Sequence, residues 1–178
     1  MKKAPLTDSE LLVLGLVAEM PRHGYELEQV IAGRGMREWT QIGFSSIYFV
    51  LGQLEKKNLV VAEKPASAKA KKSFSITEKG RETLVTETLG AFATLRSSSS
   101  PLLLGMLHWP ALNREEALGA LRSRGELVKQ EIERLEALQF DQQPQPDYVD
   151  ALFDYSLHQL RAESEWIART LAYMQTKP

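Results

Sequence analysis

The spacing of apolar residues predicts that the first part of the chain is mostly helical. Residues 8–20 are apolar on nearly every side and a proline follows them, so we expect a helix that is buried from more than one direction. Thr7 and Glu10 have the spacing of a capping box, which fixes where this helix begins. A second helix is expected over residues 24–32, and the glycine-containing stretch 33–35 suits a left-handed helix end.

A third helix and a β-hairpin complete this N-terminal pattern. The helix is expected over residues 45–57, with Ser45 as its N-cap. Its apolar positions recur at helical spacing and define a buried face: Ile47, Val50, Leu51 and Leu54. Two strand-like runs, residues 59–62 and 73–76, flank a lysine-rich tip at residues 66–72. Three helices followed by a hairpin with a basic tip is the order of elements in a winged helix-turn-helix domain.

The remaining sequence predicts longer helices. Thr77 can cap a helix that the serine run at residues 97–100 interrupts, and a short apolar segment, residues 102–109, follows. Asn113 and Glu116 then form a second capping box. Beyond it, apolar positions recur in alternating steps of three and four: Leu118, Leu121, Gly125, Val128, Ile132 and Leu135.

A second helix of the same kind follows a proline-containing loop at residues 141–146. Its repeating positions are Phe153, Leu157, Leu160, Ser164, Ile167, Leu171 and Met174. Two such helices are expected to pack as an antiparallel pair. Further apolar side chains lie off these seams, where one helix pair would leave them exposed, and they therefore predict a partner surface: Leu127, Leu138, Leu152, Tyr155 and Trp166.

The predicted fold class is mostly α with a small β-hairpin, arranged as two domains. We expect a winged helix-turn-helix DNA-binding domain over residues 1–81 and a helical dimerisation domain over residues 82–178. The dimer contacts are expected on the first and the last helix: Leu11, Leu14, Phe153, Leu157, Leu160, Trp166, Ile167 and Leu171.

Charge is distributed unevenly between the two predicted domains. The whole chain has a net charge of −1, but residues 1–81 hold 13 Lys+Arg against 9 Asp+Glu, whereas residues 82–178 hold 9 against 14. A basic excess in one part of a chain indicates a polyanion-binding region. The predicted DNA contacts are the side chains off the buried face of the third helix and the lysines of the hairpin tip: Ser45, Ser46, Tyr48, Phe49, Gln53, Lys56, Lys69, Lys71 and Lys72.

Four short motifs, in this order along the chain, resemble the PadR family of bacterial regulators: His23-Gly24-Tyr25, Ile47-Tyr48, Leu54-Glu55 and Thr77-Glu78-Lys79-Gly80. The segments SSSSPLLLGMLHW and AESEWIARTL are similar to family members with a virulence-activator-type C-terminal domain. The chain departs from the family pattern at Phe74, where tyrosine is more common, and at Phe49, where proline is common.

The resemblance implies a homodimer that binds a two-fold symmetric DNA operator, usually as a repressor, and that a small aromatic effector releases in some members. Trp109 and Trp166 are the candidate effector-binding residues, although tryptophans in such helices more often belong to the core.

Other function classes find little support in the sequence. The chain has no cysteine, and its three histidines are not spaced to share a metal from one helix, so we expect no metal, no cofactor and no catalytic site. We expect neither a signal peptide nor a membrane span, and therefore a cytoplasmic protein. The main alternative is a winged-helix module that binds protein rather than DNA, for which a lysine-rich tip would have no evident use.

Overall fold

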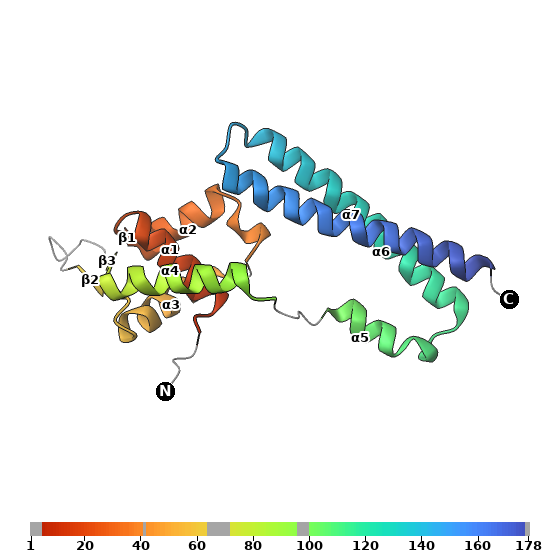
Figure 1. Cartoon of the computed structure of the whole chain (residues 1–178), viewed down its shortest axis with the longest axis horizontal. Helices are drawn as coiled ribbons and strands as arrows, with labels where there is room; N and C mark the ends of the chain where they lie inside the picture. Colours follow the sequence, from red (N-terminus) through yellow and green to blue (C-terminus); the bar gives the residue numbers. More distant parts are fainter. Residues whose placement is uncertain (1–4, 41, 64–71, 96–99, 177–178) are drawn as a thin grey trace. The chain divides into compact units, whose positions relative to one another are not determined.

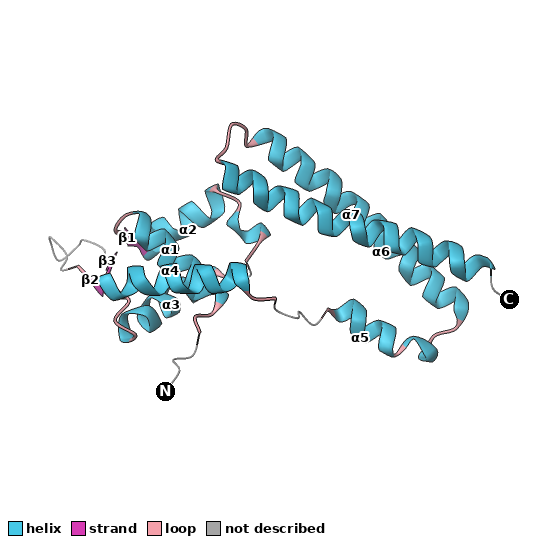
Figure 2. Ribbon diagram, viewed as in Figure 1, coloured by secondary structure: helices cyan, strands magenta, loops and turns pink. Residues whose placement is uncertain are grey.

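The computed structural model describes residues 5–40, 42–63, 72–95 and 100–176 and consists of two compact units, Met1–Arg96 and Ser97–Pro178 (Figure 1). The predicted domain boundary at residues 81/82 differs from this division, because it falls within a helix that packs against the first helix of the chain. The fold class is as predicted: helices dominate, with one small sheet (Figure 2).

The first unit contains four α-helices, one short 3₁₀ helix and three short strands among its described residues. In chain order these are α1 (Asp8–Glu19), β1 (Arg22–His23), α2 (Gly24–Gly33), η1 (Met36–Glu38), α3 (Phe44–Lys56), β2 (Val60–Ala62), β3 (Ser73–Ile76) and α4 (Glu78–Ala93). The capping box of α1 is present, with Thr7 Oγ1 accepting from the backbone N–H of Glu10 and the Glu10 carboxylate accepting from that of Thr7. Gly35 lies in the left-handed region, with φ 62°, just after α2 ends.

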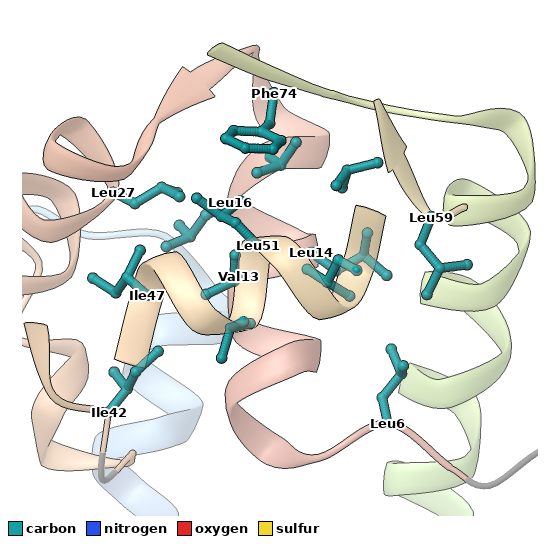
Figure 3. Close-up of a cluster of buried hydrophobic side chains, with 14 of the residues drawn as sticks. Leu6, Val13, Leu14, Leu16, Leu27, Ile42, Ile47, Leu51, Leu59 and Phe74 are labelled. Atoms are coloured by element: carbon teal, nitrogen blue, oxygen red, sulfur yellow. The ribbon is translucent and has the colours of Figure 1, made fainter. Parts of the chain in front are cut away.

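Helix α1 lies at the centre of this unit and packs against α3, α4 and β3. Four of its side chains are exposed by 2% or less: Val13, Leu14, Leu16 and Val17. Leu27, Ile47, Leu51 and Leu59 come to the same cluster from other elements (Figure 3). The prediction that the first helix is buried from more than one direction is therefore confirmed.

The sheet has one strand more than the predicted hairpin. Strand β3 lies between β1 and β2 and pairs with both in antiparallel fashion, with Arg22 opposite Phe74 and Val60 opposite Ile76. Sequence reasoning missed β1 because two residues are too short to show an alternating pattern.

Helix α3 begins one residue earlier than predicted. Its N-cap is Gly43, whose backbone is extended, so Ser45 lies within the first turn and is not the cap. Ile42 before the cap and Ile47 in the second turn are both buried in the core. An apolar pair at these positions is a hydrophobic staple, which fixes the start of a helix without a side-chain cap.

The second unit consists of α5 (Pro101–Leu107), η2 (Trp109–Ala111), α6 (Arg114–Asp141) and α7 (Asp147–Thr176). The capping box of Asn113 and Glu116 is present at the start of α6, as predicted. Helices α6 and α7 pack along each other (Figure 1), and ion pairs between Arg124 and Glu163 and between Arg161 and Glu136 flank their interface.

The predicted repeat positions of α6 and α7 are all buried or half-buried. The buried side chains are Ala117, Leu121, Val128, Leu135, Phe153, Leu157 and Ile167. Ala117 is buried and Leu118 only half-buried, so the seam begins one residue earlier than predicted. Gly125 brings no side chain to the seam; a Cβ there would lie 3.5 Å from Cγ2 of Ile167, which is ordinary packing distance.

Candidate nucleic-acid interface

Helix α3 has one buried face, and the predicted DNA-contacting side chains that the structure describes on this helix lie off that face. Ile47, Val50, Leu51 and Leu54 are each exposed by 5% or less. On the other side, Tyr48 is 53% and Phe49 67% exposed, Lys56 is exposed, and Ser46 and Gln53 are half-buried. Ser45 lies in the first turn. Large aromatic side chains this exposed on a helix that is firmly packed from behind indicate a binding surface.

The C-terminal end of α3 is closed by a Schellman motif. Asn58 has φ 56°, and the backbone N–H groups of Asn58 and Leu59 donate to the carbonyls of Glu55 and Leu54. Asparagine is one of the few residues other than glycine that adopt this left-handed conformation readily. The predicted end of the helix at Asn58 is therefore explained by its backbone.

The segment Thr77 to Gly80 fastens the start of α4 to the end of α3. The Thr77 hydroxyl lies 2.9 Å from the carbonyl of Asn58 and 3.1 Å from that of Leu59, and it also accepts the N–H of Gly80 at the start of α4. Lys79 Nζ donates to the carbonyl of Lys57 at 2.8 Å. A Cβ on Gly80 would lie 2.1 Å from the Leu59 carbonyl oxygen, so only glycine fits here.

The wing consists of β2, β3 and the residues between them, of which 64–71 lie outside the described part of the chain. The predicted contacts Lys69 and Lys71 are therefore not located, whereas Lys72 is. Its Nζ is 3.1 Å from a carboxylate oxygen of Glu55 and 5.0 Å from the centre of the Phe74 ring. Both partners of this ion pair are substantially exposed, so another anion can easily replace Glu55 as the partner of Lys72.

The turn between α1 and α2 is held by polar contacts that sequence reasoning did not assign. Arg22, 7% exposed, donates from Nε to the carbonyl of Leu16 and from Nη2 to Glu19. Arg34 makes a bidentate contact with the same carboxylate, and its hydrogen bond is the main cause that holds the pKa of Glu19 below its ordinary value. The sequence feature that could have indicated the contact between Arg22 and Glu19 is the spacing of three residues between an acidic and a basic side chain.

His23 caps α2, and its side chain accepts the N–H of Glu26 through Nδ1 at 3.2 Å. The Glu26 carboxylate accepts the backbone N–H of His23 in return. Histidine is an unusual residue in this role, and the sequence analysis did not predict it.

A partly buried ion pair joins α1 to the end of α3. Lys57 Nζ lies 2.5 Å from the carboxylate of Glu10, which is 5% exposed. Burial by itself would raise the pKa of Glu10, but hydrogen bonds from Lys57 and from the backbone of Thr7 outweigh it and hold that pKa below its ordinary value.

An apolar cavity of about 350 Å³ lies within the second unit, between α5, η2 and the start of α6. Its lining residues are Pro101, Leu102, Gly105, Met106, Trp109, Leu112, Ala117, Ala120, Leu121 and Arg124. Trp109, one of the two predicted effector contacts, is among them. Trp166 lies half-buried on α7 and is not among these lining residues.

The predicted dimer residues occupy two kinds of position. Leu14, Phe153, Leu157 and Ile167 are buried within their own units and have almost no surface to offer a partner, since α1 is central and α7 packs on α6. Leu11, Leu160, Trp166 and Leu171 are half-buried.

Neither a metal site nor a membrane span is found in the described residues. No group of three or more His, Asp or Glu side chains among them lies close enough together to hold a metal ion. No described helix combines the length and apolar character needed to cross a membrane.

Solved structures of similar fold cover almost the whole chain. Bacillus subtilis PadR in complex with operator DNA matches with a TM-score of 0.75 and 17% identity, over 93% of this chain and 98% of that one. A PadR-like transcriptional regulator from Bacillus cereus matches with a TM-score of 0.67 and 20% identity, over 96% and 100%. Bacillus subtilis PadR in complex with p-coumaric acid matches with a TM-score of 0.73 and 16% identity, over 97% and 99%.

Identities this low establish the fold alone, and a comparison with curated proteins gives no match. The sequence itself, however, matches a family model, and the matched residues, 13–86, include α2, α3, the sheet and the Thr77 to Gly80 segment. This N-terminal segment therefore matches the PadR-like family of transcriptional regulators.

Proposed function

We propose that this protein is a transcription regulator that binds a specific DNA operator through the exposed face of α3. One observation carries the proposal: α3 is anchored by four buried apolar side chains and presents Tyr48, Phe49, Gln53 and Lys56 on its other sides. A helix fits the major groove of B-DNA, where side chains reach the edges of the bases.

The wing supports the same proposal. Lys72 forms an exposed ion pair with Glu55 beside α3, and a DNA phosphate can replace that carboxylate. Lysines that contact phosphate contribute affinity without reading sequence, and this contribution falls steeply with salt.

In this proposal the protein is a cytoplasmic homodimer that acts as a repressor. The C-terminal unit holds the two copies together. The exposed apolar side chains of α6 and α7, such as Leu127, Leu152 and Tyr155, support a partner surface there. A two-fold dimer requires a two-fold operator with half-sites about 10 bp apart, or a multiple of that spacing.

The effector is proposed to be a small aromatic molecule bound in the Trp109 cavity. A volume of about 350 Å³ is within the range of small-molecule sites, and a mainly apolar lining with one arginine, Arg124, is typical of them. Bacillus subtilis PadR has been solved with p-coumaric acid, which makes an aromatic acid the first compound to test. Binding should change the tryptophan fluorescence of the protein, and Trp109→Phe should remove most of that change.

Selection of bound sites from random DNA tests the proposed function. The expected result is one enriched inverted repeat, whose binding weakens steeply as salt is raised. Recovery of no preferred sequence, together with salt-insensitive binding, would favour the alternative of a protein-interaction module.

A further inference from the structure

Gly24 and Tyr48 form an unusually close contact between α2 and α3. Gly24 is the first residue of α2, and Tyr48 lies in the second turn of α3. A Cβ on Gly24 would lie 2.6 Å from Cε1, 2.7 Å from Cζ and 3.1 Å from Cδ1 of the tyrosine ring. Ordinary van der Waals contact begins at 3.4 Å, so the ring occupies the space that any side chain at position 24 would need.

The contact lies where α2, α3 and the wing meet. Gly24 and Tyr48 line a small hollow together with His23, Lys72 and Phe74. Gly24 itself is buried, whereas Tyr48 is 53% exposed. One side of the ring therefore rests on the backbone of α2 while the rest of it remains accessible. The ring can lie this close to α2 because residue 24 has no side chain.

We propose that Gly24 is a positioning residue that sets the orientation of the Tyr48 ring on the DNA-facing surface, and that Tyr48 thereby contributes to the choice of operator sequence. This inference rests on the proposed function, because it assumes that the exposed face of α3 meets DNA. An aromatic ring that already lies in one orientation loses less conformational freedom on binding than a freely rotating one, so it contributes more to the affinity for the bases it contacts.

Gly24→Ala tests this contact without disturbing the backbone. Gly35 is the one described glycine with a positive φ, so Gly24 has a backbone that alanine can adopt. Alanine is also a better helix former than glycine. The atoms in the way belong to the outer part of a side chain rather than to backbone, and they can move aside while the fold is kept.

The chain offers a matched control in the same helix. Gly33 is the last residue of α2, and a Cβ added there would meet nothing within 4 Å. Gly33→Ala thus makes the same chemical change without displacing a ring.

The test is a double-mutant cycle in the full-length protein, measured by titration of the selected operator and of operators changed at single base pairs. Tyr48→Ala is expected to weaken operator binding by roughly tenfold or more and to flatten the preference at one or two positions. Gly24→Ala should reproduce part of both effects, and Gly33→Ala neither. In the double variant Gly24→Ala/Tyr48→Ala, affinity should equal that of Tyr48→Ala within about two-fold, because no ring remains to be displaced.

One further variant and a melting measurement keep the test decisive. Tyr48→Phe retains the ring, so it should still be sensitive to Gly24→Ala. If Gly24→Ala alone melts at a lower temperature than the wild type, the double variant should recover part of the loss, which reports the same contact through stability.

The inference is wrong if Gly24→Ala and Tyr48→Ala lower affinity independently, so that their effects multiply, and if only Tyr48→Ala alters the base preference. The proposed function would remain intact. If Tyr48→Ala, Gln53→Ala and Lys56→Ala all bind the operator like the wild type, both the inference and the DNA-binding role of α3 are wrong.

Discussion

The two units of the chain bury their apolar side chains to very different extents. In the first unit the central helix α1 has four side chains exposed by 2% or less, and α2, α3 and the sheet contribute to the same cluster. In the second unit a single seam between α6 and α7 is buried, and large apolar side chains remain exposed: Leu103, Leu104, Leu107, Leu127, Phe140, Tyr148 and Tyr155. The first unit also exposes apolar side chains, most of all Phe92 and Leu95 in and just after α4.

This difference indicates a division of roles. A unit with a complete core can change its surface side chains without unfolding, which suits a surface that distinguishes DNA sequences. A helix pair that leaves so much apolar surface exposed is suited to association, because burial of that surface in a partner is favourable. We therefore propose that the first unit accounts for recognition and the second for assembly.

Removal of the second unit should have the largest effect. A fragment of residues 1–100 should remain folded, because its core is its own, but should be mostly monomeric. It should lose about 10² to 10⁴ in operator affinity, since two linked domains bind two half-sites at high effective concentration. Sedimentation gives the oligomeric state, and titration of full and half operators gives the affinity. A fragment that remains dimeric and binds the full operator as tightly as the intact chain would contradict the division of roles.

The two faces of α3 should respond differently to substitution. Leu54→Ala should lower the free energy of unfolding by about 2–5 kcal/mol, because it leaves a cavity in the core. Gln53→Ala, one residue away, should change stability little and alter which bases are preferred. Urea unfolding and titration of operator variants separate the two effects. If the Leu54→Ala protein melted like the wild type, the buried position of this side chain would be contradicted.

The attachment of α4 to α3 should depend on Gly80. Gly80→Ala places a methyl group against the Leu59 carbonyl and should cost about 1–3 kcal/mol or more, because backbone atoms cannot easily move aside. The matched control is Gly90→Ala in the same helix, where a Cβ meets nothing within 4 Å. Thermal melting of both variants checks the expectation, and equal melting temperatures would show that the close contact does not exist.

Wing lysines should contribute a smaller, sequence-independent effect. Replacement of Lys69, Lys71 and Lys72 by alanine should weaken all operators similarly and flatten the slope of log affinity against log salt by roughly 2–3 units. Lys129→Ala, an exposed change on α6, is the control and should leave the slope unchanged. A slope that stays the same in the triple variant would place the wing away from DNA.

The smallest expected effect concerns the ion pair between Glu10 and Lys57. Because the pKa of Glu10 is lowered in the folded protein, its stabilisation is present above the ordinary glutamate pKa of about 4.3 and is lost as the pH falls through the lower, folded value. Glu10→Gln should therefore be less stable than the wild type at pH 7, by roughly 1 kcal/mol, and the gap should narrow in acid. Urea unfolding at both pH values measures it, and a gap that widens in acid would contradict the lowered pKa.

Sequence patterns were most informative where local chemistry decides the structure. The capping boxes at Thr7 and Asn113, the end of α3 at Asn58 and the buried face of α3 follow from residue types at fixed spacing, and all were predicted. The helical repeats likewise predicted the packing of α6 against α7.

What the sequence did not predict depends on contacts between distant segments. Strand β1 exists because Arg22 and His23 lie beside β3, about fifty residues away, and two residues carry no periodicity of their own. The seat of Tyr48 on Gly24 and the packing of Gly80 on Leu59 arise from helix positions that only the folded chain defines. The motifs that contain these glycines were visible in the sequence, but their steric role was not.

Hydrogen exchange of the intact protein with and without its selected operator is the most direct test of DNA binding by α3, because it locates the DNA on the chain. Operator DNA should slow exchange in α3 and in the wing strands β2 and β3 more than unrelated DNA does, while exchange in the buried seam of α6 and α7 should change little. Protection confined to residues 101–176, with α3 exchanging as in the free protein, would contradict the claim that the exposed face of α3 reads the operator.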